Sequence, residues 1–326
     1  MRALCVHTLA DDLSGLALVD RPVPAPGAGE VLVRIEAAAL GWPDLLMTRG
    51  AYQARPDLPF VPGMEGAGVV VAADPSSGWH AGDRVICGAQ TGLCAQYGVF
   101  AGDAVMRLPE PLDFAQGAAL RVAYLTAWVT LVRLGRAQPG EWVVVHGAAV
   151  GVGLATVDLA HALGLRVIAV ASDAVKRAAV ERLHAPAAVL AGPTGIRDAV
   201  RDLTGGRGAD VIVDPVGGDV FDEACRYAAF GGRLMVVGFA GGRIATVPAN
   251  IPLIKGFAVI GVRAGEYGRR LPAHGRAHLA EIHALAEAGT IRPHVHARLP
   301  LDAWREGFAA MAERRVIGRS VVCPHS

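Results

Sequence analysis

The hydrophobic positions of the first 120 residues form short runs, each ended by turn residues. Three runs have the length and the β-branched content of strands: 31–35, 68–71 and 83–87. Pro43 suits the first turn of a helix and Gly50 suits its end, so we expect one short helix among these strands. The pattern predicts a small β-rich domain over residues 1–120.

From about residue 143 the rhythm changes to strand, helix, strand, helix. Continuous apolar runs lie at 142–146, 166–170, 209–213 and 233–237, separated by amphipathic segments of helical length. Such an alternation is typical of a parallel sheet covered on both faces. We therefore expect an α/β fold in which a doubly wound domain, residues 121–264, is inserted into the β-rich domain. Residues 265–326 would complete that β-rich domain.

Composition and charge narrow the possible functions. The 326 residues suffice for two cores, and 52% are hydrophobic. Lys and Arg total 31 against 30 for Asp and Glu, so no net field attracts nucleic acid or an anionic membrane. We find no signal peptide and no apolar run long enough to span a membrane. The odd number of cysteines, five, suits a reducing compartment, so we expect a cytoplasmic protein.

A candidate dinucleotide-binding turn follows the run 142–146. Against the G-x-G-x-x-G pattern the matching residues are Ala148, Val150 and Gly153, so only the last glycine is present. A helix starting at this turn would offer free N–H groups and its positive end to a pyrophosphate. A tight turn without a ligand is the alternative. The residues of the turn expected to bind the cofactor are Ala149, Val150, Gly151 and Val152.

The end of the second strand of this domain bears on the choice of cofactor. A site for NAD places Asp or Glu there to bond the ribose hydroxyls, whereas this chain has Ala171. Ser172 and Lys176 would bond a 2′-phosphate, which favours NADPH. In the alternative interpretation Lys176 is a solvated helix residue, and Asp173 caps the helix or bonds the ribose.

No metal site or nucleophile is expected. There is no C-x-x-C pair, and Cys87 lies too far from Cys94 in sequence to form a zinc knuckle. Two histidine pairs share a face of one element: His274 with His278, and His294 with His296. We interpret them as exposed side chains, because no third ligand accompanies either pair. Hydride transfer needs no protein nucleophile, since the cofactor carries the reactive bond.

Several motifs in order resemble one known family. They are G-W-P-D-L-L-M-T-R-G-A-Y-Q (41–53), P-G-M-E-G-A-G (62–68), A-G-D-R-V (81–85), A-Y-L-T-A (123–127), D-P-V-G-G (214–218) and V-G-F (237–239). Together they resemble the zinc-free quinone oxidoreductases (zeta-crystallin-like) of the medium-chain dehydrogenase/reductase superfamily. The resemblance implies a GroES-like domain around a Rossmann domain. In the zinc enzymes of that superfamily a cysteine stands at position 41 and a histidine at 64, so Gly41 and Met64 imply that the catalytic metal is absent.

The resemblance also implies roles for individual residues. Lys176 would hold the 2′-phosphate, and Tyr52 would orient or protonate the substrate's carbonyl oxygen. Tyr52 is otherwise a turn aromatic that packs against Pro56 or Pro59. Gly41 replaces an asparagine, which removes an amide expected near the nicotinamide ribose. The other cofactor contacts implied are Thr126 and Phe239 at the ribose and the ring, Arg315 at the phosphates, and Val216 of the D-P-V-G-G motif.

Three functions remain open for this chain. The first is an NADPH-dependent reductase that transfers hydride to a quinone or an α,β-unsaturated carbonyl without metal. The second is an enoyl-CoA (acryloyl-CoA-like) reductase, in which arginines at 55, 263, 269 and 270 would meet a coenzyme A phosphate. The third is a non-catalytic NADPH-binding protein. In each, the ligand is a small molecule, and the apolar strand 257–262 predicts a homodimer.

Overall fold

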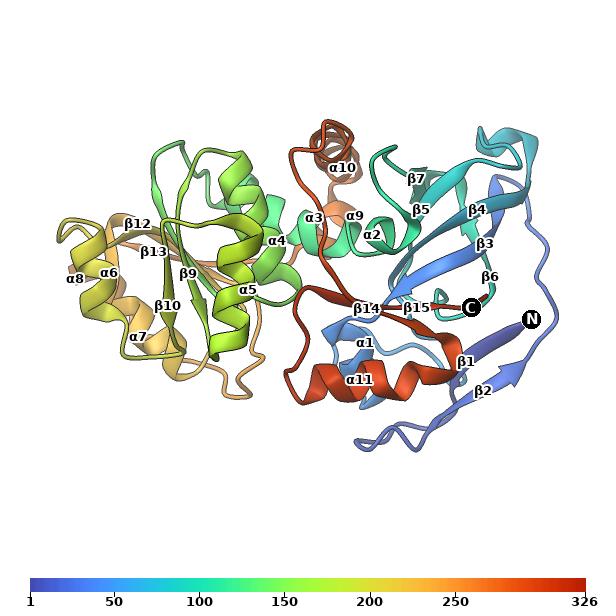
Figure 1. Ribbon diagram of the computed structural model, residues 1–326, viewed down its shortest axis with the longest axis horizontal. Helices are drawn as coiled ribbons and strands as arrows, with labels where there is room; N and C mark the ends of the chain where they lie inside the picture. The colour runs from blue at the N-terminus through green and yellow to red at the C-terminus, as the bar shows by residue number, and fades with distance from the viewer. The chain divides into compact units, whose positions relative to one another are not determined.

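The computed structural model describes all residues, 1–326, and they divide into two compact units. Unit 1 comprises Met1–Val122 and Arg292–Ser326, and unit 2 is Ala123–Ile291 (Figure 1). Both ends of the chain lie in unit 1. Unit 2 is therefore an insertion, as the alternation of strands and helices predicts.

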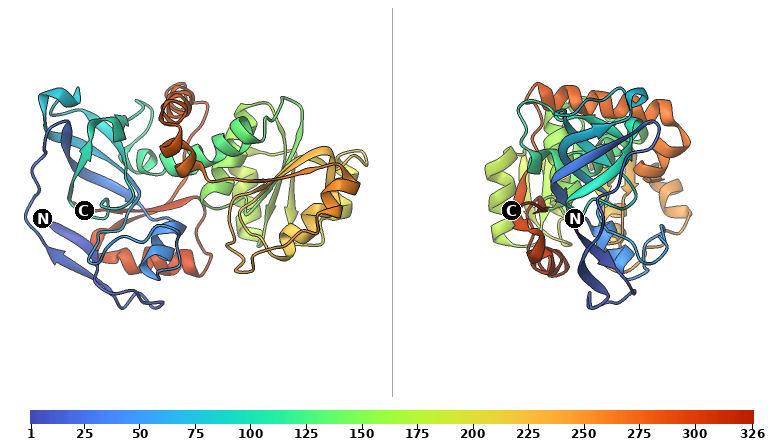
Figure 2. Two further views of the ribbon diagram at one scale, coloured as in Figure 1. Left: turned by 180° about the vertical axis from the view of Figure 1, so that it is seen from behind. Right: turned by 90° about the vertical axis from the view of Figure 1, so that its right-hand side faces the viewer.

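Unit 1 is built on a seven-stranded sheet. Its main path runs β14-β15-β3-β4-β5-β7, with β6 paired to β3, and β1 and β2 form a separate hairpin. In Figure 2 the C-terminal strand β15, in red, lies beside β3, in blue, so the last residues complete the sheet that the first ones begin. The strands are β1 (Arg2–Val6), β2 (Leu16–Asp20), β3 (Glu30–Ala39), β4 (Glu65–Ala73), β5 (Arg84–Gly88), β6 (Tyr97–Ala101), β7 (Val105–Arg107), β14 (Val295–Pro300) and β15 (Arg319–Cys323). The helices are α1 (Trp42–Thr48), α2 (Phe114–Ala118) and α11 (Trp304–Ala312), with 3-10 turns at Pro75–Ser77, Gly102–Ala104 and Leu301–Ala303.

Unit 2 is a doubly wound Rossmann domain. Its six strands are all parallel, in the order β10-β9-β8-β11-β12-β13. Helices α4 and α5 pack against β8, β9 and β10, and α7 packs against β11 and β12 (Figure 1). The strands are β8 (Trp142–His146), β9 (Arg166–Ala171), β10 (Ala188–Ala191), β11 (Ala209–Asp214), β12 (Ala228–Val236) and β13 (Ala258–Gly261). The first helix is α3 (Arg121–Trp128), which starts at the end of unit 1 and continues into a π-helical segment (Val129–Leu134). The others are α4 (Gly151–Ala162), α5 (Ala174–His184), α6 (Arg197–Leu203), α7 (Asp219–Tyr227), α8 (Asn250–Lys255), α9 (Ala264–Arg270) and α10 (Pro272–Glu287).

The buried strands explain why the sequence pattern is apolar without alternation. Every residue of β8 is buried, and β9 is buried after its first residue. A strand covered by helices on both faces has no side that can accept polar residues. The continuous runs read from the sequence therefore correspond to the central strands of the sheet.

The structure places the second junction between the units later than we predicted. We placed it at 264–265, whereas α9 and α10 belong to unit 2, which ends at Ile291. Contacts between α9 and the rest of unit 2 explain the difference. The Arg133 guanidinium lies over the Tyr267 ring of α9, 5.5 Å from the ring centre, and Arg133 also donates a hydrogen bond to the Tyr267 hydroxyl. An amphipathic helix pattern shows which face is buried but not which domain buries it.

None of the helices combines the length and the apolar composition that a membrane-spanning segment needs.

Candidate cofactor site

The turn between β8 and α4 brings the helix close to the strand. Gly147 has a positive φ of 59°, and a methyl group at Gly153 would lie only 2.1 Å from the Gly147 carbonyl oxygen. Glycine is therefore required at 153 by the close helix–strand approach. Val150, which replaces the middle glycine of the pattern, has ordinary extended backbone at φ −129°.

The start of α4 has the chemistry of an anion site. Its N-cap residue is Val150, and no side chain caps the helix. The first N–H groups of a helix have no acceptor within the helix, and the helix dipole is positive at this end. The residues expected to bind a pyrophosphate, Ala149 to Val152, therefore fit that ligand.

Lys176, which follows the end of β9, is not the solvated side chain of the alternative interpretation. Only 9% of Lys176 is exposed, and its Nζ lies 3.5 Å from Asp173 Oδ2. Asp173 is the N-cap of α5, because its carboxylate accepts from the Lys176 N–H at 2.9 Å. Ser172 is exposed and donates to Asp173 at 3.2 Å. Lys176 is thus packed into the start of α5 and not free in solvent.

The loops after β11 and β12 lie against each other. The Val237 N–H donates to the Asp214 carbonyl at 2.9 Å, and the Gly241 N–H donates to the Val216 carbonyl at 2.8 Å. A methyl group at Gly217 would lie 2.8 Å from the Phe239 ring. The structure therefore brings Val216 and Phe239 together, at the carboxyl ends of the strands where doubly wound sheets bind ligands. Phe239 is 42% exposed, so its ring is available to a ligand.

Asp214 shapes the first of these loops. Its Oδ1 accepts from the N–H groups of Val216 and Gly217, at 2.8 and 2.9 Å. Burial raises the pKa of this carboxyl, and these two N–H groups oppose the rise. The loop that holds Val216 is therefore fixed by a fully buried side chain.

In unit 1, Asp44 joins two segments. Its carboxylate accepts from the Gly41 N–H at 2.8 Å and from the Gly63 N–H at 3.0 Å. Burial raises its pKa to about 6, and Arg319 opposes the rise. This carboxylate therefore links Gly41, one of the two zinc-ligand positions of the metal enzymes, to Gly63, which directly precedes the other, Met64.

A charged pair lies beside Gly41. The Arg319 guanidinium pairs with Glu65, which is fully buried and also accepts from the Val122 N–H at 2.7 Å. A methyl group at Gly41 would lie 3.3 Å from Arg319 Nη1 and 3.0 Å from Asp44 Oδ2. Side chains of this cluster thus border the space that a residue at 41 would use.

The remaining residues that the sequence analysis singled out differ in burial and contacts. Tyr52 is half-buried and packs against the apolar core of unit 1, and Met64 does the same. Arg315 is exposed and pairs with Glu313 at 2.6 Å. Thr126 is half-buried in α3 of unit 2. The roles predicted for these residues, and for Gly41, stay predictions.

No group of three or more His, Cys, Asp or Glu side chains is arranged to hold a metal ion. Our description of both α10 histidines as exposed was wrong for His278, of which only 8% is exposed. Its ring stacks on Tyr267 with 5.9 Å between centres, because α9 folds back onto α10. His274 is exposed, as expected.

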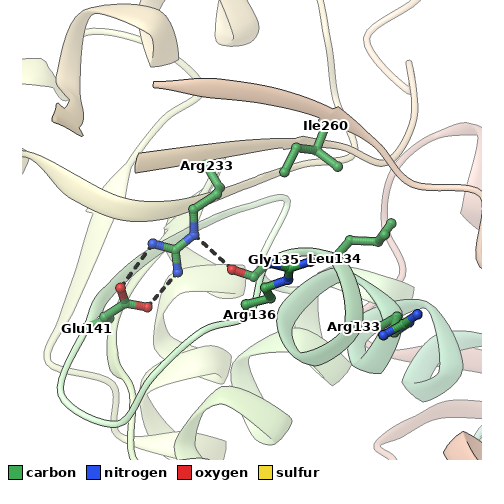
Figure 3. Close-up of a pocket in the computed structure, with 7 residues that line it drawn as sticks. All are labelled: Arg133, Leu134, Gly135, Arg136, Glu141, Arg233 and Ile260. Atoms are coloured by element: carbon green, nitrogen blue, oxygen red, sulfur yellow. Dashed lines mark hydrogen bonds and ion pairs between the residues drawn. The ribbon is translucent and has the colours of Figure 1, made fainter. Parts of the chain in front are cut away.

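A hollow of about 390 Å³ in unit 2 is not the cofactor site (Figure 3). Arg233 crosses it and pairs with Glu141 at 2.6 and 3.0 Å. Glu141 directly precedes β8, and Arg233 is in register with Ala258, the first residue of β13. The hollow therefore lies toward the amino ends of the strands, whereas ligands of this fold bind at the carboxyl ends.

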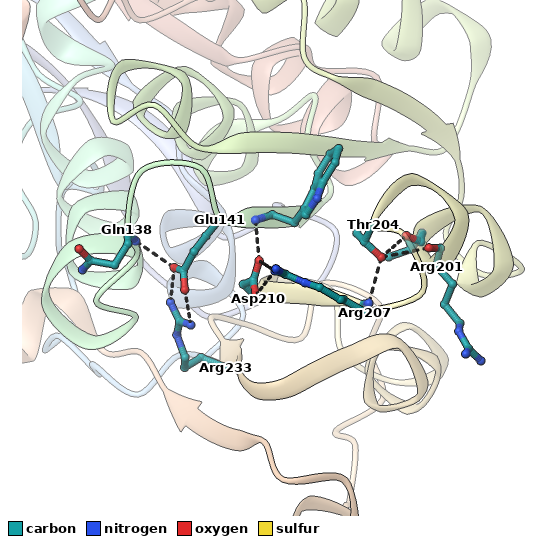
Figure 4. A network of polar contacts seen from close by, with 10 residues as sticks. Gln138, Glu141, Arg201, Thr204, Arg207, Asp210 and Arg233 are labelled. Atoms are coloured by element: carbon teal, nitrogen blue, oxygen red, sulfur yellow. Dashed lines mark hydrogen bonds and ion pairs between the residues drawn. The ribbon is translucent and has the colours of Figure 1, made fainter.

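Hydrogen bonds and ion pairs connect the segments at the amino ends of the unit 2 strands (Figure 4). Asp210 accepts from the Trp142 N–H at 2.8 Å and from Arg207 at 3.0 Å. The Thr204 hydroxyl, which is buried, accepts from the Gly208 N–H at 2.9 Å. This end of the sheet is thus a structural anchor.

Sequence reasoning missed three buried acidic residues, two in unit 1 and one in unit 2. Asp44, Glu65 and Asp214 are each no more than 1% exposed. The sequence does contain a signal for them, an acidic residue beside or within an apolar segment. Such a carboxylate, if buried, needs a partner. The partner itself, such as Arg319 for Glu65, is 254 residues away in sequence and is not visible without the fold.

Comparison with known proteins agrees with this geometry. Residues 27–117 match the alcohol dehydrogenase GroES-like domain, and residues 151–277 match the zinc-binding dehydrogenase model. Quinone oxidoreductase-like protein 2 of Mus musculus is 36% identical over 320 residues, which is 97% of this chain and 90% of that protein.

Two solved structures share the whole fold. One is an NAD-dependent alcohol dehydrogenase that is 30% identical, with a TM-score of 0.90 over 99% of both chains. The other is a mycobacterial protein in complex with NADPH that is 28% identical, with a TM-score of 0.90 over 99% of this chain and all of that one. The NAD-dependent protein and the NADPH-bound protein are similar to this chain to nearly the same degree, so the comparisons do not decide between NAD and NADPH.

The GroES-like unit, the inserted Rossmann unit and the matches define a class: the chain belongs to the medium-chain dehydrogenase/reductase superfamily. Within it the chain belongs to the quinone oxidoreductase (zeta-crystallin-like) branch. It is therefore an oxidoreductase, of a family that binds a nicotinamide cofactor. The non-catalytic alternative does not agree with this finding.

Proposed function

We propose that this enzyme is a cytoplasmic, NADPH-dependent reductase that transfers hydride to a quinone or an α,β-unsaturated carbonyl without a metal ion. The observation that carries the choice of NADPH is Lys176, a packed ammonium group at the start of α5. Strand β9 ends on Ala171, so no carboxylate stands at the end of this strand to repel a phosphate. All five cysteines are free, and this supports a reducing compartment.

The residues of unit 2 fit each part of the cofactor. The uncapped start of α4 suits the pyrophosphate, and Lys176 suits the 2′-phosphate. Phe239, with its exposed ring, suits the nicotinamide end, where the bound cofactor supplies the hydride. The chain's own part is to hold these groups and to orient the acceptor.

The donor set at positions 41 and 64 favours chemistry without a metal. Gly41 offers no side chain, and the Met64 thioether is a poor ligand for zinc. Alcohol oxidation relies on a Lewis acid to stabilise the alkoxide. A quinone or enone delocalises the incoming charge over its own conjugated system and needs less help. We propose that Tyr52 orients or protonates the carbonyl oxygen.

The enoyl-thioester alternative has one observation in its favour. Three arginines of unit 2, at 263, 269 and 270, surround Glu266, and their side chains are 60–76% exposed. The hydrogen bonds from Arg270 and Arg269 lower the pKa of Glu266 to about 2. The cluster thus keeps a net positive charge that would suit a coenzyme A phosphate.

A substrate panel tests the proposal. The purified protein is dialysed against a chelator, its zinc content is measured, and NADPH and NADH oxidation are followed with a quinone, an enone and a short enoyl-CoA ester. We expect NADPH oxidation with the quinone or the enone, and far less than one zinc per chain. Activity with the enoyl-CoA ester alone would select the alternative. About one retained zinc per chain, or activity that chelation removes, would contradict the proposal.

A further inference from the structure

One carboxylate lies inside the helix that follows the phosphate turn. Asp158 is the only acidic residue of α4, and only 8% of it is exposed. A buried charge costs free energy unless partners compensate it, and removing one such partner is usually expensive. The partners that compensate the buried charge of Asp158 therefore indicate its role.

The two oxygens of Asp158 have partners from two other helices. The Tyr124 hydroxyl of α3 donates to Oδ2 at 2.5 Å. On the other side, Nδ1 of His184, the last residue of α5, lies 3.3 Å from Oδ1. Burial and the negative charge of Asp158 raise the pKa of Tyr124 well above its usual value, so the phenol stays a hydrogen-bond donor at working pH.

Each of the three helices carries a residue that we assign to the cofactor. Thr126 follows Tyr124 by two residues in α3, which places it at most about one turn away. Gly151 is the first residue of α4, and Lys176 lies in the first turn of α5. Asp158 therefore joins the helices that present the nicotinamide, pyrophosphate and 2′-phosphate contacts.

We infer that Asp158 is a positioning residue that holds α3, α4 and α5 in one arrangement and so sets the affinity for the nicotinamide cofactor. The inference rests on the proposed function, because the roles of Thr126 and Lys176 come from it. It goes beyond that function by assigning a cofactor-related role to Asp158, Tyr124 and His184, none of which contacts the cofactor in the proposal.

A purely structural role makes a different prediction. Apolar side chains of similar volume would join three helices with equal or greater stability. If Asp158 served stability alone, its loss would lower the melting temperature and leave the affinity of the folded protein unchanged. Cofactor affinity measured well below the melting temperature therefore separates the two roles.

The test measures NADPH and NADH dissociation constants by fluorescence titration, with melting temperatures, for Asp158→Ala, Tyr124→Phe and Asp158→Asn. We expect both cofactors to bind about tenfold more weakly to Asp158→Ala and Tyr124→Phe, since a hydrogen bond to a charged group is lost. Asp158→Asn keeps an acceptor for the Tyr124 hydroxyl, so we expect it to stay within about threefold of the wild type.

Thr204→Val is the matched control. It removes another buried hydroxyl of unit 2, one that bonds the Gly208 N–H at the amino ends of the strands. We expect a lower melting temperature and unchanged cofactor affinity.

The outcomes separate this inference from the proposed function. A wild type that binds neither cofactor overturns both. A wild type that binds NADPH, with Tyr124→Phe and Asp158→Ala binding equally well, overturns the positioning role alone. So does Asp158→Asn binding as weakly as Asp158→Ala. If Asp158→Ala does not fold, Tyr124→Phe carries the test, because it deletes one hydroxyl only.

Discussion

His146 is a buried ionisable residue directly before the phosphate turn. It is the last residue of β8, only 1% exposed, and its Nε2 lies 2.5 Å from the Tyr227 hydroxyl. Burial lowers its pKa to about 3. The ring is therefore neutral in the folded protein at physiological pH, and it links the end of β8 to the end of α7.

The lowered pKa of His146 predicts a loss of stability in mild acid. Below its unfolded pKa of about 6.5 the unfolded chain takes up a proton, while the folded chain does not until about pH 3, so stability falls as pH falls through this window. Between pH 7 and 5 this removes about 2 kcal/mol from the free energy of unfolding.

Chemical denaturation of the wild type and His146→Gln at pH 7 and 5 measures this loss. We expect the variant to lack it. Asp44, whose raised pKa of about 6 acts in the opposite direction, is present in both proteins and cancels. An identical pH dependence in the two proteins would show that His146 takes up its proton in the folded state too.

Lys176 tests the choice of cofactor. We expect Lys176→Ala to raise the KM for NADPH about ten- to a hundredfold and to change that for NADH little, because only the 2′-phosphate offers a charge to the ammonium. Steady-state kinetics with both cofactors measure this, with Arg182→Ala, an exposed residue near the other end of α5, as the control. Equal losses with both cofactors would mean that Lys176 does not meet the phosphate. The ribose-binding alternative predicts instead that the wild type prefers NADH and that Asp173→Ala loses activity with it.

At the scale of elements, the sequence was most informative where burial is uniform. Strands β8, β9 and β11 coincide with the apolar runs to within one residue, because central strands exclude most polar side chains on both faces. Strand β12 (Ala228–Val236) begins well before its run at 233–237, and its early residues include exposed ones. Strand β10 was not among those runs: it is only four residues long, and its residues are partly buried or exposed. The placement of α9 and α10 could not be predicted, because it depends on contacts such as that of Arg133 with Tyr267.

Gly153 tests the close approach of α4 to β8. We expect Gly153→Ala to destabilise unit 2 by more than about 2 kcal/mol, because the added methyl group would overlap the Gly147 carbonyl and force the helix away. Gly261→Ala in β13 is the control, since nothing lies within 4 Å of a methyl group there. Thermal melting compares the two, and similar melting temperatures would show that α4 yields without cost.

At the scale of the whole molecule, the arrangement of the sheet in unit 2 leaves β13 at an edge. Exposed apolar side chains lie in neighbouring elements: Phe230 of β12 is 88% exposed, and Leu253 and Ile254 of α8 are 80% and 74% exposed. An open edge with apolar surroundings favours pairing with another chain.

We predict a homodimer formed through this edge. Light scattering should give twice the chain mass of 33.8 kDa at micromolar concentration. Leu253→Glu combined with Ile254→Glu should give the monomer mass, because charges would be buried without partners. A monomeric wild type would contradict the prediction, and a dimeric double variant would place the interface elsewhere.

The alternation of strands and helices predicted the inserted domain, and the motifs predicted the family. The roles of Lys176 and Phe239 stay predictions. The sequence did not predict which charged residues are buried. Asp44, Glu65 and Asp158 find their partners only when distant segments come together, and the burial of Lys176 likewise follows from packing.

The central claim is that hydride passes from NADPH to an electron-poor carbon acceptor without a metal. It is tested most directly by reducing an enone with NADPH deuterated at both C4 positions, using protein freed of metal by a chelator. We predict one deuterium at the β-carbon of the product, found by mass spectrometry and NMR. A product without deuterium, or product formed only after zinc is restored, would contradict the account.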